Sequence, residues 1–465
     1  MEVLADTRLW SEVHFGTAQL GDRRRTQRLV ESAAAIACHP QKPFTQVFDW
    51  NDLRGFYRLC DCQEATLSVV QQPHWQQTRQ AMAQQPLVLI LHDTTFLDYT
   101  SHTALTGAGP IGEGNGQGFL QHNSLAVLPA PRQVLGLAYQ QLRVRQPRPQ
   151  GENSYQRQRR PRESIQWLEG IRAAGVAPAE CCWVDVADRG CDFYEAMVAA
   201  RELGHHFLFR VFEDRMLYAA AERKQPVKLL AYARSMPSAG SDTFEITGRG
   251  GRPGRTATVS LAAVAVWVPA PRGTPRRAHQ PLVQAWLVRI WEPKPPAQVD
   301  EPVEWLLLCS LPTTTLEQLK ERRDWYSCRW LLEVYHDVEK NGCSEEDRRF
   351  ETAARLETCL AVLSVVAVRI LQLRCALDHQ ANAPAEQVAT RPEMEVVRRL
   401  THQGRGVMTV AAFVRGVARL GGFLGRKRDG QPGVRVLWRG YQRLQDVLLG
   451  FSLRQPSLAT GVEGS

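Results

Sequence analysis

Two continuous apolar runs, each closed by an aspartate, constrain the fold of this chain more than any other feature. The first, LVLILHDTTFL (residues 87–97), has Asp93 near its C-terminal end, and the second, CCWVDVAD (residues 181–188), ends at Asp188. Runs of this length without alternation are typical of central strands that are buried on both faces of a sheet. Because sites in α/β sheets are built at the ends of such strands, Asp93 and Asp188 are candidate functional residues.

The segments around these strands predict an α/β sheet. SLAVLPA and QVLGLAYQQLRVR follow the first strand after a glycine-rich loop (residues 107–118), and we expect a meander there. A helical pattern (FYEAMVAARELG) and a strand pattern (HHFLFRV) follow Asp188 and complete a βαβ unit. Short strand-like runs, separated by Gly, Pro and Arg over about residues 240–312, indicate a β-rich insertion.

The length of 465 residues predicts more than one domain. We expect a helical domain over residues 1–75, an α/β core with the insertion over residues 76–375, and a helical C-terminal domain over residues 376–465. The apolar stretch from Cys359 to Val368 is shorter than the ~20 residues that span a bilayer, so it predicts a buried helix.

Basic residues outnumber acidic ones, with a formal net charge of +9, which favours polyanionic partners. Arg23, Arg24 and Arg25 form the basic front of a helical pattern over residues 20–37. This pattern fits either a solvated surface helix or a helix laid against DNA phosphates, which arginine holds bidentately. The arginine-rich stretch of residues 143–162 is likewise either a basic linker or a DNA-contacting loop.

The 11 cysteines show no spacing of a zinc site, and we expect reduced thiols in a cytosolic protein. The first residues, MEVLADTRLWSEVHF, carry acidic residues early and lack an apolar core segment, so no signal peptide is expected. The sequence therefore favours a cytoplasmic protein without a membrane partner.

A long helix is predicted over residues 316–341, beginning with a capping box of Thr315 and Gln318 and ending at Asn341-Gly342. At about 100° per residue, one face spanning roughly 100° collects an acid, two bases and two aromatic residues. These residues are Tyr326, Arg329, Trp330, Glu333 and Lys340. Taken alone, this pattern favours an ordinary helix with an i,i+4 ion pair between Arg329 and Glu333.

Asp93, Asp188 and Glu333 together would bring three carboxylates to one place. Carboxylates that repel one another are usually compensated by a divalent cation, and oxygen ligands suit Mg²⁺, with Mn²⁺ as a substitute. Two such ions per site can activate water or a 3′ hydroxyl and stabilise the leaving oxygen of a phosphodiester. Glu333 and His336 also form one ExxH pair, but a di-iron site requires two copies.

At these residues the sequence resembles the DDE transposases of the insertion-sequence-four family, and within it the transposon-five type. The stretch YSCRWLLEVYHDVEK carries the family's pattern of Tyr, Arg, Glu and Lys at Tyr326, Arg329, Glu333 and Lys340. HDTTFL and VADRGCD match the first and second aspartate motifs, in the right order. AQLGDRRRTQRLV resembles the end-binding segment, and ARLGGFLGRKRDGQPG resembles the dimerisation domain.

The resemblance implies an RNase H-like core with a β-rich insertion, and a bacterial, nucleoid-associated enzyme. It implies cut-and-paste transposition, in which a homodimer on double-stranded DNA cleaves transposon ends through a hairpin and transfers them into target DNA. Asp93, Asp188 and Glu333 are then the catalytic metal ligands. DNA contacts are implied for Tyr326, Arg329, Lys340, Arg210 and Trp330, and base stacking for Trp305.

Asp185 and Asp192 flank Asp188, so the assignment of the second ligand rests on the alignment of the motif. Two rival functions also remain: a DNA-binding relative that does not cut, and a simple RNase H-like nuclease acting on RNA–DNA hybrids. The helical segments at both ends of the chain favour the transposase over the nuclease.

Overall fold

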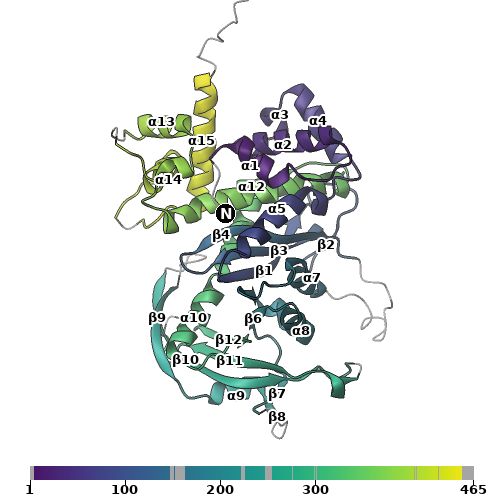
Figure 1. The fold of residues 1–465 in the computed structure, drawn as a ribbon, viewed down its shortest axis with the longest axis vertical. Coiled ribbons are helices and arrows are strands. Elements are labelled where there is room, and N and C mark those ends of the chain that lie inside the picture. Colours follow the sequence, from purple (N-terminus) through teal and green to yellow (C-terminus); the bar gives the residue numbers. More distant parts are fainter. Residues whose placement is uncertain are drawn as a thin grey trace, which may run out of the picture.

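The computed structural model shows a mixed α/β protein with one large sheet and helices toward both ends of the chain (Figure 1). This agrees with the predicted class. The structure describes residues 5–146, 151, 163–220, 226–246, 254–274, 276–297, 299, 301–402, 404, 406–427 and 429–452. Most of the arginine-rich stretch of residues 143–162 lies outside the described residues.

The described strands form a single sheet in the order β2-β3-β1-β5-β6-β12-β11-β10-β7-β8, with β4 on β3 and β9 on β10. They are β1 (Leu87–Asp98), β2 (Gly109–Ile111), β3 (Gly116–Leu128), β4 (Gln133–Arg143), β5 (Cys182–Ala187), β6 (His206–Arg210), β7 (Met216–Tyr218), β8 (Pro226–Lys228), β9 (Gly240–Ile246), β10 (Arg255–Val268), β11 (Val283–Trp291) and β12 (Glu304–Cys309). β1 pairs antiparallel with β3 and parallel with β5, and β5 pairs parallel with β6. The predicted meander and βαβ unit are confirmed, and the strand-like runs over about residues 240–312 form β9 to β12.

The described α-helices cover the two faces of the core strands and form the ends of the chain. They are α1 (Thr7–Phe15), α2 (Arg23–Cys38), α3 (Phe44–Val47), α4 (Trp50–Cys60), α5 (Leu67–Met82), α7 (Ile165–Ala174), α8 (Tyr194–Glu202), α9 (Leu229–Ser235), α10 (Leu316–Ser327), α11 (Trp330–Asp337), α12 (Ala353–His379), α13 (Arg391–Leu400), α14 (Val410–Leu420) and α15 (Val434–Ser452). α7 contacts β1, β3 and β4, whereas α11 contacts β1 and α12 contacts β4.

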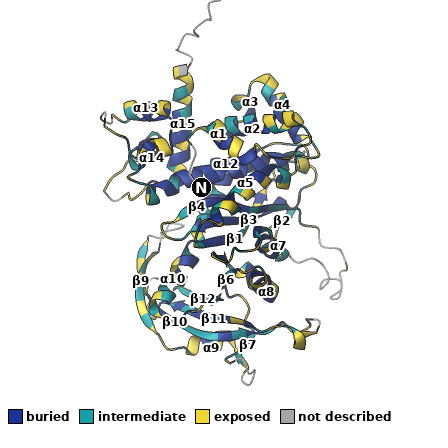
Figure 2. Ribbon diagram, in the orientation of Figure 1, coloured by how far each residue is buried: buried dark blue, intermediate teal, exposed yellow. Residues whose placement is uncertain are grey.

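Helix α12 connects the sheet to both helical ends of the chain. It packs against β4 and α5, and also against α2, α4, α14 and α15 (Figure 1). Figure 2 shows it dark blue along most of its length, and 94% of its most apolar stretch is buried. Among the described residues it is the one helix long and apolar enough to cross a membrane, but its burial is that of a core helix, as predicted.

The prediction of one continuous helix over residues 316–341 is wrong. The structure has α10, a turn at Cys328 and Arg329, then α11, and finally a π-helix, η3 (Val338–Gly342). At the turn, the backbone N–H groups of Arg329, Leu331 and Leu332 bond to carbonyls three residues back. This tighter pattern interrupts the α-helix immediately before the segment that carries Glu333. The predicted capping box at Thr315 is confirmed.

Two buried histidines join the first helix to the core. His74 Nε2 accepts a hydrogen bond from the Leu137 backbone N–H at 3.0 Å, so its proton is on Nδ1, which lies 3.0 Å from His14 Nδ1. Both rings are therefore neutral in this contact. Burial, reinforced by the charge of Arg369, lowers the pKa of His14 to about 3, and burial holds the pKa of His74 well below its usual value.

We predict that acid weakens this contact. Because the folded-state pKa of His14 is about 3 and an unfolded histidine titrates near ~6.5, stability is lost as the pH falls from about 6.5 toward 3. Each such histidine costs up to about 1.4 kcal/mol per pH unit in that range. His14→Gln should reduce the loss of unfolding free energy between pH 7 and pH 5, measured with urea. If His14→Gln lost as much unfolding free energy between pH 7 and pH 5 as the wild type, the buried, neutral state of His14 would be contradicted. The control is His279→Gln at the surface, which should leave this loss unchanged.

Candidate active site

Three candidate residues occupy one level on three adjacent parallel strands. The β1–β5 register runs from Leu87 opposite Cys182 to His92 opposite Ala187, so the next residues are Asp93 on β1 and Asp188, which directly follows β5. The β5–β6 register ends with Ala187 opposite Phe209, which places Arg210 next to Asp188 in the same way. Residues level with each other on paired strands point to the same face of the sheet. The strands therefore align the two aspartates and the arginine in a row.

Helix α11 brings Glu333 to the same place through Arg329. Arg329 Nη1 lies 2.9 Å from Asp93 Oδ2, and Arg329 Nη2 lies 3.5 Å from Glu333 Oε1. The guanidinium is mostly buried, and Asp93, Asp188 and Glu333 all contribute to the rise in its pKa, against the effect of burial. One cation thus holds the helix carboxylate beside the strand carboxylates.

The negative charge of Asp93 is disfavoured by its surroundings. Burial raises the pKa of Asp93 to about 7. Arg329 opposes this rise, whereas the carboxylates of Asp188 and Glu333 add to it. Repulsion between carboxylates in a partly dry place is the condition that a divalent cation relieves.

The structure distinguishes the three aspartates of the second motif. Both carboxylate oxygens of Asp185 lie 2.9 Å from histidine nitrogens, and Asp185 is fully buried. Asp192 Oδ2 pairs with Arg215 at 2.7 Å and accepts from two backbone N–H groups. Within the part of the chain that the structure describes, the Asp188 carboxylate accepts a single hydrogen bond, from the Gly190 N–H at 2.8 Å. Asp188 is therefore the aspartate of the three that is placed for a ligand.

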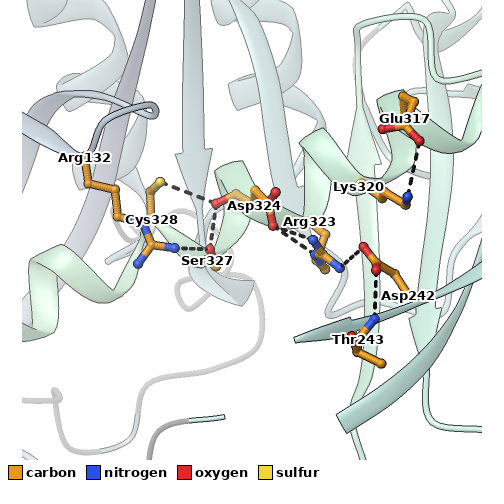
Figure 3. A network of polar contacts seen from close by, with 9 residues as sticks. All are labelled: Arg132, Asp242, Thr243, Glu317, Lys320, Arg323, Asp324, Ser327 and Cys328. Atoms are coloured by element: carbon orange, nitrogen blue, oxygen red, sulfur yellow. Dashed lines mark hydrogen bonds and ion pairs between the residues drawn. The ribbon is translucent and has the colours of Figure 1, made fainter. Parts of the chain in front are cut away.

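Helix α10, which precedes the cluster, is held along its C-terminal half. Arg323 Nη1 lies 2.7 Å from Asp242 Oδ2 on β9 (Figure 3). At its C-terminal end, Arg132 from the β3–β4 turn donates to Ser327 Oγ at 2.8 Å (Figure 3). These contacts tie the insertion and the meander to the helix that leads into Arg329.

The two aromatic candidates, Tyr326 and Trp305, lie against each other. Their ring centroids are 5.1 Å apart, and Phe244 packs on the other side of Trp305 at 5.6 Å. Tyr326 is only 4% exposed, and its buried hydroxyl has no hydrogen-bond partner among the described residues. Trp330, by contrast, is 43% exposed at the start of α11. The structure thus presents Trp330 at the surface and encloses Tyr326.

Lys340 lies at the far end of the same cluster. Its Nζ contacts the Phe96 carbonyl at the end of β1 and lies 3.4 Å from Glu346. The amine is thus near the strand that carries Asp93. The carboxylates therefore have three basic residues near them: Arg210 at the end of β6, Arg329, and Lys340.

Arg23, Arg24 and Arg25 are exposed on the first turn of α2, as the basic-front pattern predicts. Arg24 pairs with Asp22 at 2.9 Å, and Arg25 pairs with Glu64 at 3.1 Å. Exposed ion pairs of this kind are weak, so both guanidinium groups can exchange these partners for phosphate.

The donor set suits hard divalent cations. Asp93, Asp188 and Glu333 offer carboxylate oxygens, which Mg²⁺ and Mn²⁺ prefer. In the described part of the chain, no three His, Cys, Asp or Glu side chains form a compact metal-binding group as they stand. Arg329, between Asp93 and Glu333, supplies the positive charge there in this structure. The three side chains therefore fit a divalent cation in two ways. Their oxygen atoms are suitable ligands, and their negative charges already hold one cation, the Arg329 guanidinium.

Sequence reasoning missed the polar chain on the opposite face of these strands. It consists of Ser124, His92, Asp185 and His205. The signal available was a charged residue, Asp185, in the middle of an otherwise apolar strand. Its partners come from distant parts of the chain, which no local pattern identifies.

Two family models match this chain, one at each end. The model described as transposase DNA-binding matches residues 7–65, which contain α1 to α4. The model described as transposase Tn5 dimerisation domain matches residues 394–455, which contain α14 and α15. The two matches support a Tn5-like transposase. They indicate a protein that binds DNA, dimerises and cleaves DNA, with a second copy of itself as partner.

The raised pKa of Asp93 gives a test of the cluster without any substrate. In the metal-free protein, the folded state keeps a proton on Asp93 up to about pH 7, whereas an unfolded aspartate loses it near ~3.9. Stability therefore falls as the pH rises through this window. Asp93→Asn, measured by urea unfolding with a chelator present, should gain unfolding free energy relative to wild type between pH 5 and pH 8. If the difference in unfolding free energy between Asp93→Asn and the wild type stayed constant from pH 5 to pH 8, the burial of Asp93 and its repulsion by the other carboxylates would be contradicted.

The matched control is Asp98→Asn, at the exposed end of the same strand. The hydroxyl and backbone N–H of Thr100 lower the pKa of Asp98, so its charge is already complete at pH 5. Its difference from wild type should stay constant between pH 5 and pH 8.

Proposed function

We propose that this protein is a cut-and-paste transposase of the DDE type in the insertion-sequence-four family, with an RNase H-like core. Asp93, Asp188 and Glu333 are its catalytic carboxylates and would hold two Mg²⁺ ions, with Mn²⁺ as a substitute. The observation that carries this proposal is the level placement of Asp93 and Asp188 on β1 and β5, with Glu333 joined to them through Arg329. The two family matches support the transposase class.

When bound, two such ions would supply activation of the attacking water or 3′ hydroxyl and stabilisation of the leaving oxygen. Basic and aromatic residues of the chain are proposed to bind and orient the DNA. On binding DNA, Arg329 exchanges Asp93 and Glu333 for a phosphate of the scissile strand, for which its planar fork is suited. Arg210 and Lys340 hold phosphates on the two sides of the carboxylates, and Trp330 contacts the DNA end from the surface.

Trp305 is proposed to stack on a base that leaves the helix during hairpin formation. It stands on β12, which pairs with β6 beside Arg210, so it lies on the strand next to the row of candidate residues. In this structure its ring packs against Tyr326. Stacking on a base therefore requires the Trp305–Tyr326 contact to open, which would also expose the buried Tyr326 hydroxyl to phosphate.

The helical ends supply the substrate and the second copy. Residues 7–65 bind the transposon end, and residues 394–455 join two copies into a synaptic homodimer that also captures target DNA. In that assembly each copy is proposed to cleave the end held mainly by the other copy.

Glu333→Gln should abolish cleavage of DNA that carries the element's own ends, with Mg²⁺ or Mn²⁺ present. Loss of one ligand removes several kcal/mol of charge stabilisation, which corresponds to roughly a thousandfold in rate. Binding to the same ends, measured by gel shift, should change little. Wild-type cleavage by the variant would remove Glu333 from the site, and binding without cutting by the unaltered protein would support a relative that does not cut.

The control for this measurement is Glu317→Gln. Glu317 lies on α10, its side chain is 82% exposed, and its recorded ion pair is with Lys320 on the surface. It should cleave at the wild-type rate.

Replacing Arg23, Arg24 and Arg25 together with alanine should weaken binding to transposon ends and reduce its salt dependence. If each contacts one phosphate, the slope of log K against log salt should fall by up to about 3. Arg399→Ala, an exposed arginine on α13, is the control. If the slope of log K against log salt were unchanged in the triple variant, the three arginines of α2 would face solvent and make no contact with DNA phosphates.

A further inference from the structure

The face of the sheet opposite the carboxylate cluster carries a continuous chain of buried hydrogen bonds. Ser124 Oγ lies 2.9 Å from His92 Nδ1, and His92 Nε2 lies 2.9 Å from Asp185 Oδ1. Asp185 Oδ2 lies 2.9 Å from His205 Nδ1, and His205 Nε2 lies 2.9 Å from the Gly175 carbonyl. The chain runs across β3, β1 and β5 to the residue before β6.

This chain lies directly behind the candidate catalytic residues. His92 precedes Asp93 on β1, and Asp185 lies three positions before Asp188. Successive strand residues point to opposite faces, so His92 and Asp93 lie on different sides of the same strand. His92 and Asp185 are fully buried, and His205 is 2% exposed.

The partners of His205 fix its protonation state. A carbonyl oxygen only accepts hydrogen bonds, so His205 Nε2 donates to Gly175. A carboxylate also only accepts, so His205 Nδ1 donates to Asp185. Both ring nitrogens therefore carry protons, and His205 is a buried imidazolium paired with the Asp185 carboxylate. His92 donates to the other carboxylate oxygen from Nε2, which leaves Nδ1 to accept the Ser124 hydroxyl.

The electrostatics agree with this assignment. Burial opposes the charge of His205, but the adjacent Asp185 carboxylate outweighs burial and raises the pKa of His205. Burial likewise opposes the charge of Asp185, but His205 and His92 hold the pKa of Asp185 below its usual value. A buried pair of this kind is costly to break, because removal of one partner leaves the other charged and dry.

We propose that Asp185 is a positioning residue that, through His92 and His205, fixes β1 and β5 relative to β6 at the level of Asp93 and Asp188. It touches no substrate and acts on the spacing of the two catalytic aspartates. Carboxylates that share a metal must be placed to within about 0.5 Å. A polar brace with fixed directions holds them more tightly than apolar packing, which tolerates sliding of the strands. This inference rests on the proposed function for its effect on cleavage, but not for the ion pair itself.

The ion pair is tested by nuclear magnetic resonance of protein labelled with ¹⁵N-histidine, at pH 8 and without DNA or metal. His205, assigned by the loss of its signals in His205→Gln, should show protons on both ring nitrogens. In Asp185→Asn the His205 ring should become neutral. A neutral His205 ring in the wild-type protein would overturn the proposal, whether or not the protein cleaves DNA.

The positioning role is tested by titrating end cleavage with Mn²⁺. Asp185→Asn should raise the Mn²⁺ concentration at half-maximal rate by roughly 10- to 100-fold while leaving affinity for DNA ends unchanged. Mn²⁺ binding in the absence of DNA, followed by electron paramagnetic resonance, should weaken in parallel. Wild-type Mn²⁺ dependence in a folded Asp185→Asn protein would overturn the proposal.

The matched control is Asp192→Asn, since Asp192 is also buried, also ion-paired and on the same segment, but on no part of the polar chain. It should lower the unfolding temperature without changing the Mn²⁺ dependence; an equal change in both variants would mean that Asp185 is merely structural. If Asp185→Asn does not fold, His92→Gln cuts the chain at β1 and leaves the ion pair. That variant should show the same raised Mn²⁺ requirement, and an unchanged requirement would overturn the proposal.

Discussion

The parallel pairing of β1, β5 and β6 is the constraint on which the rest of the site depends. Parallel strands in register bring residues of equal offset to one level, and here that level holds Asp93, Asp188 and Arg210. The apolar residues below them, such as Leu89 and Val184, are fully buried in the main hydrophobic core together with residues of α11 and α12, which fixes the face to which the aspartates point. Burial of the strands therefore sets the position of the carboxylates before any side-chain contact is made.

The two faces of these strands differ in how the negative charges on them are compensated. On one face, three carboxylates lie near Arg329, and burial raises the pKa of Asp93 to about 7 despite the charge of Arg329. On the other face, Asp185 is fully compensated by His205 and His92. A cluster of carboxylates with excess negative charge therefore lies on one face of the strands, and a fully hydrogen-bonded polar chain lies on the other. This is expected where a rigid scaffold supports reactive groups. Helix α12 extends this scaffold to the helices at both ends of the chain, which match the DNA-binding and dimerisation models.

Much of this arrangement follows from local sequence. The apolar runs of residues 87–97 and 181–188 predict buried strands, and the capping box at Thr315 predicts the start of α10, because these signals depend on near neighbours. The break at Arg329 was not predicted, since its cause lies in tertiary contacts and not in a helix-breaking residue. The burial of Tyr326 and the partners of Asp185 were missed for the same reason: their contacts join segments far apart in sequence. The metal ions and the DNA contacts remain predictions from the motif.

The central claim is that Asp93, Asp188 and Glu333 bind divalent cations together. The most direct measurement is cleavage of the protein's own backbone by hydroxyl radicals generated at bound Fe²⁺, with the cut sites mapped by mass spectrometry in the presence of transposon-end DNA. Cuts are expected near all three residues, and excess Mg²⁺ should suppress them. Cuts confined to other parts of the chain, or cuts near only one of the three that Mg²⁺ does not suppress, would contradict the claim.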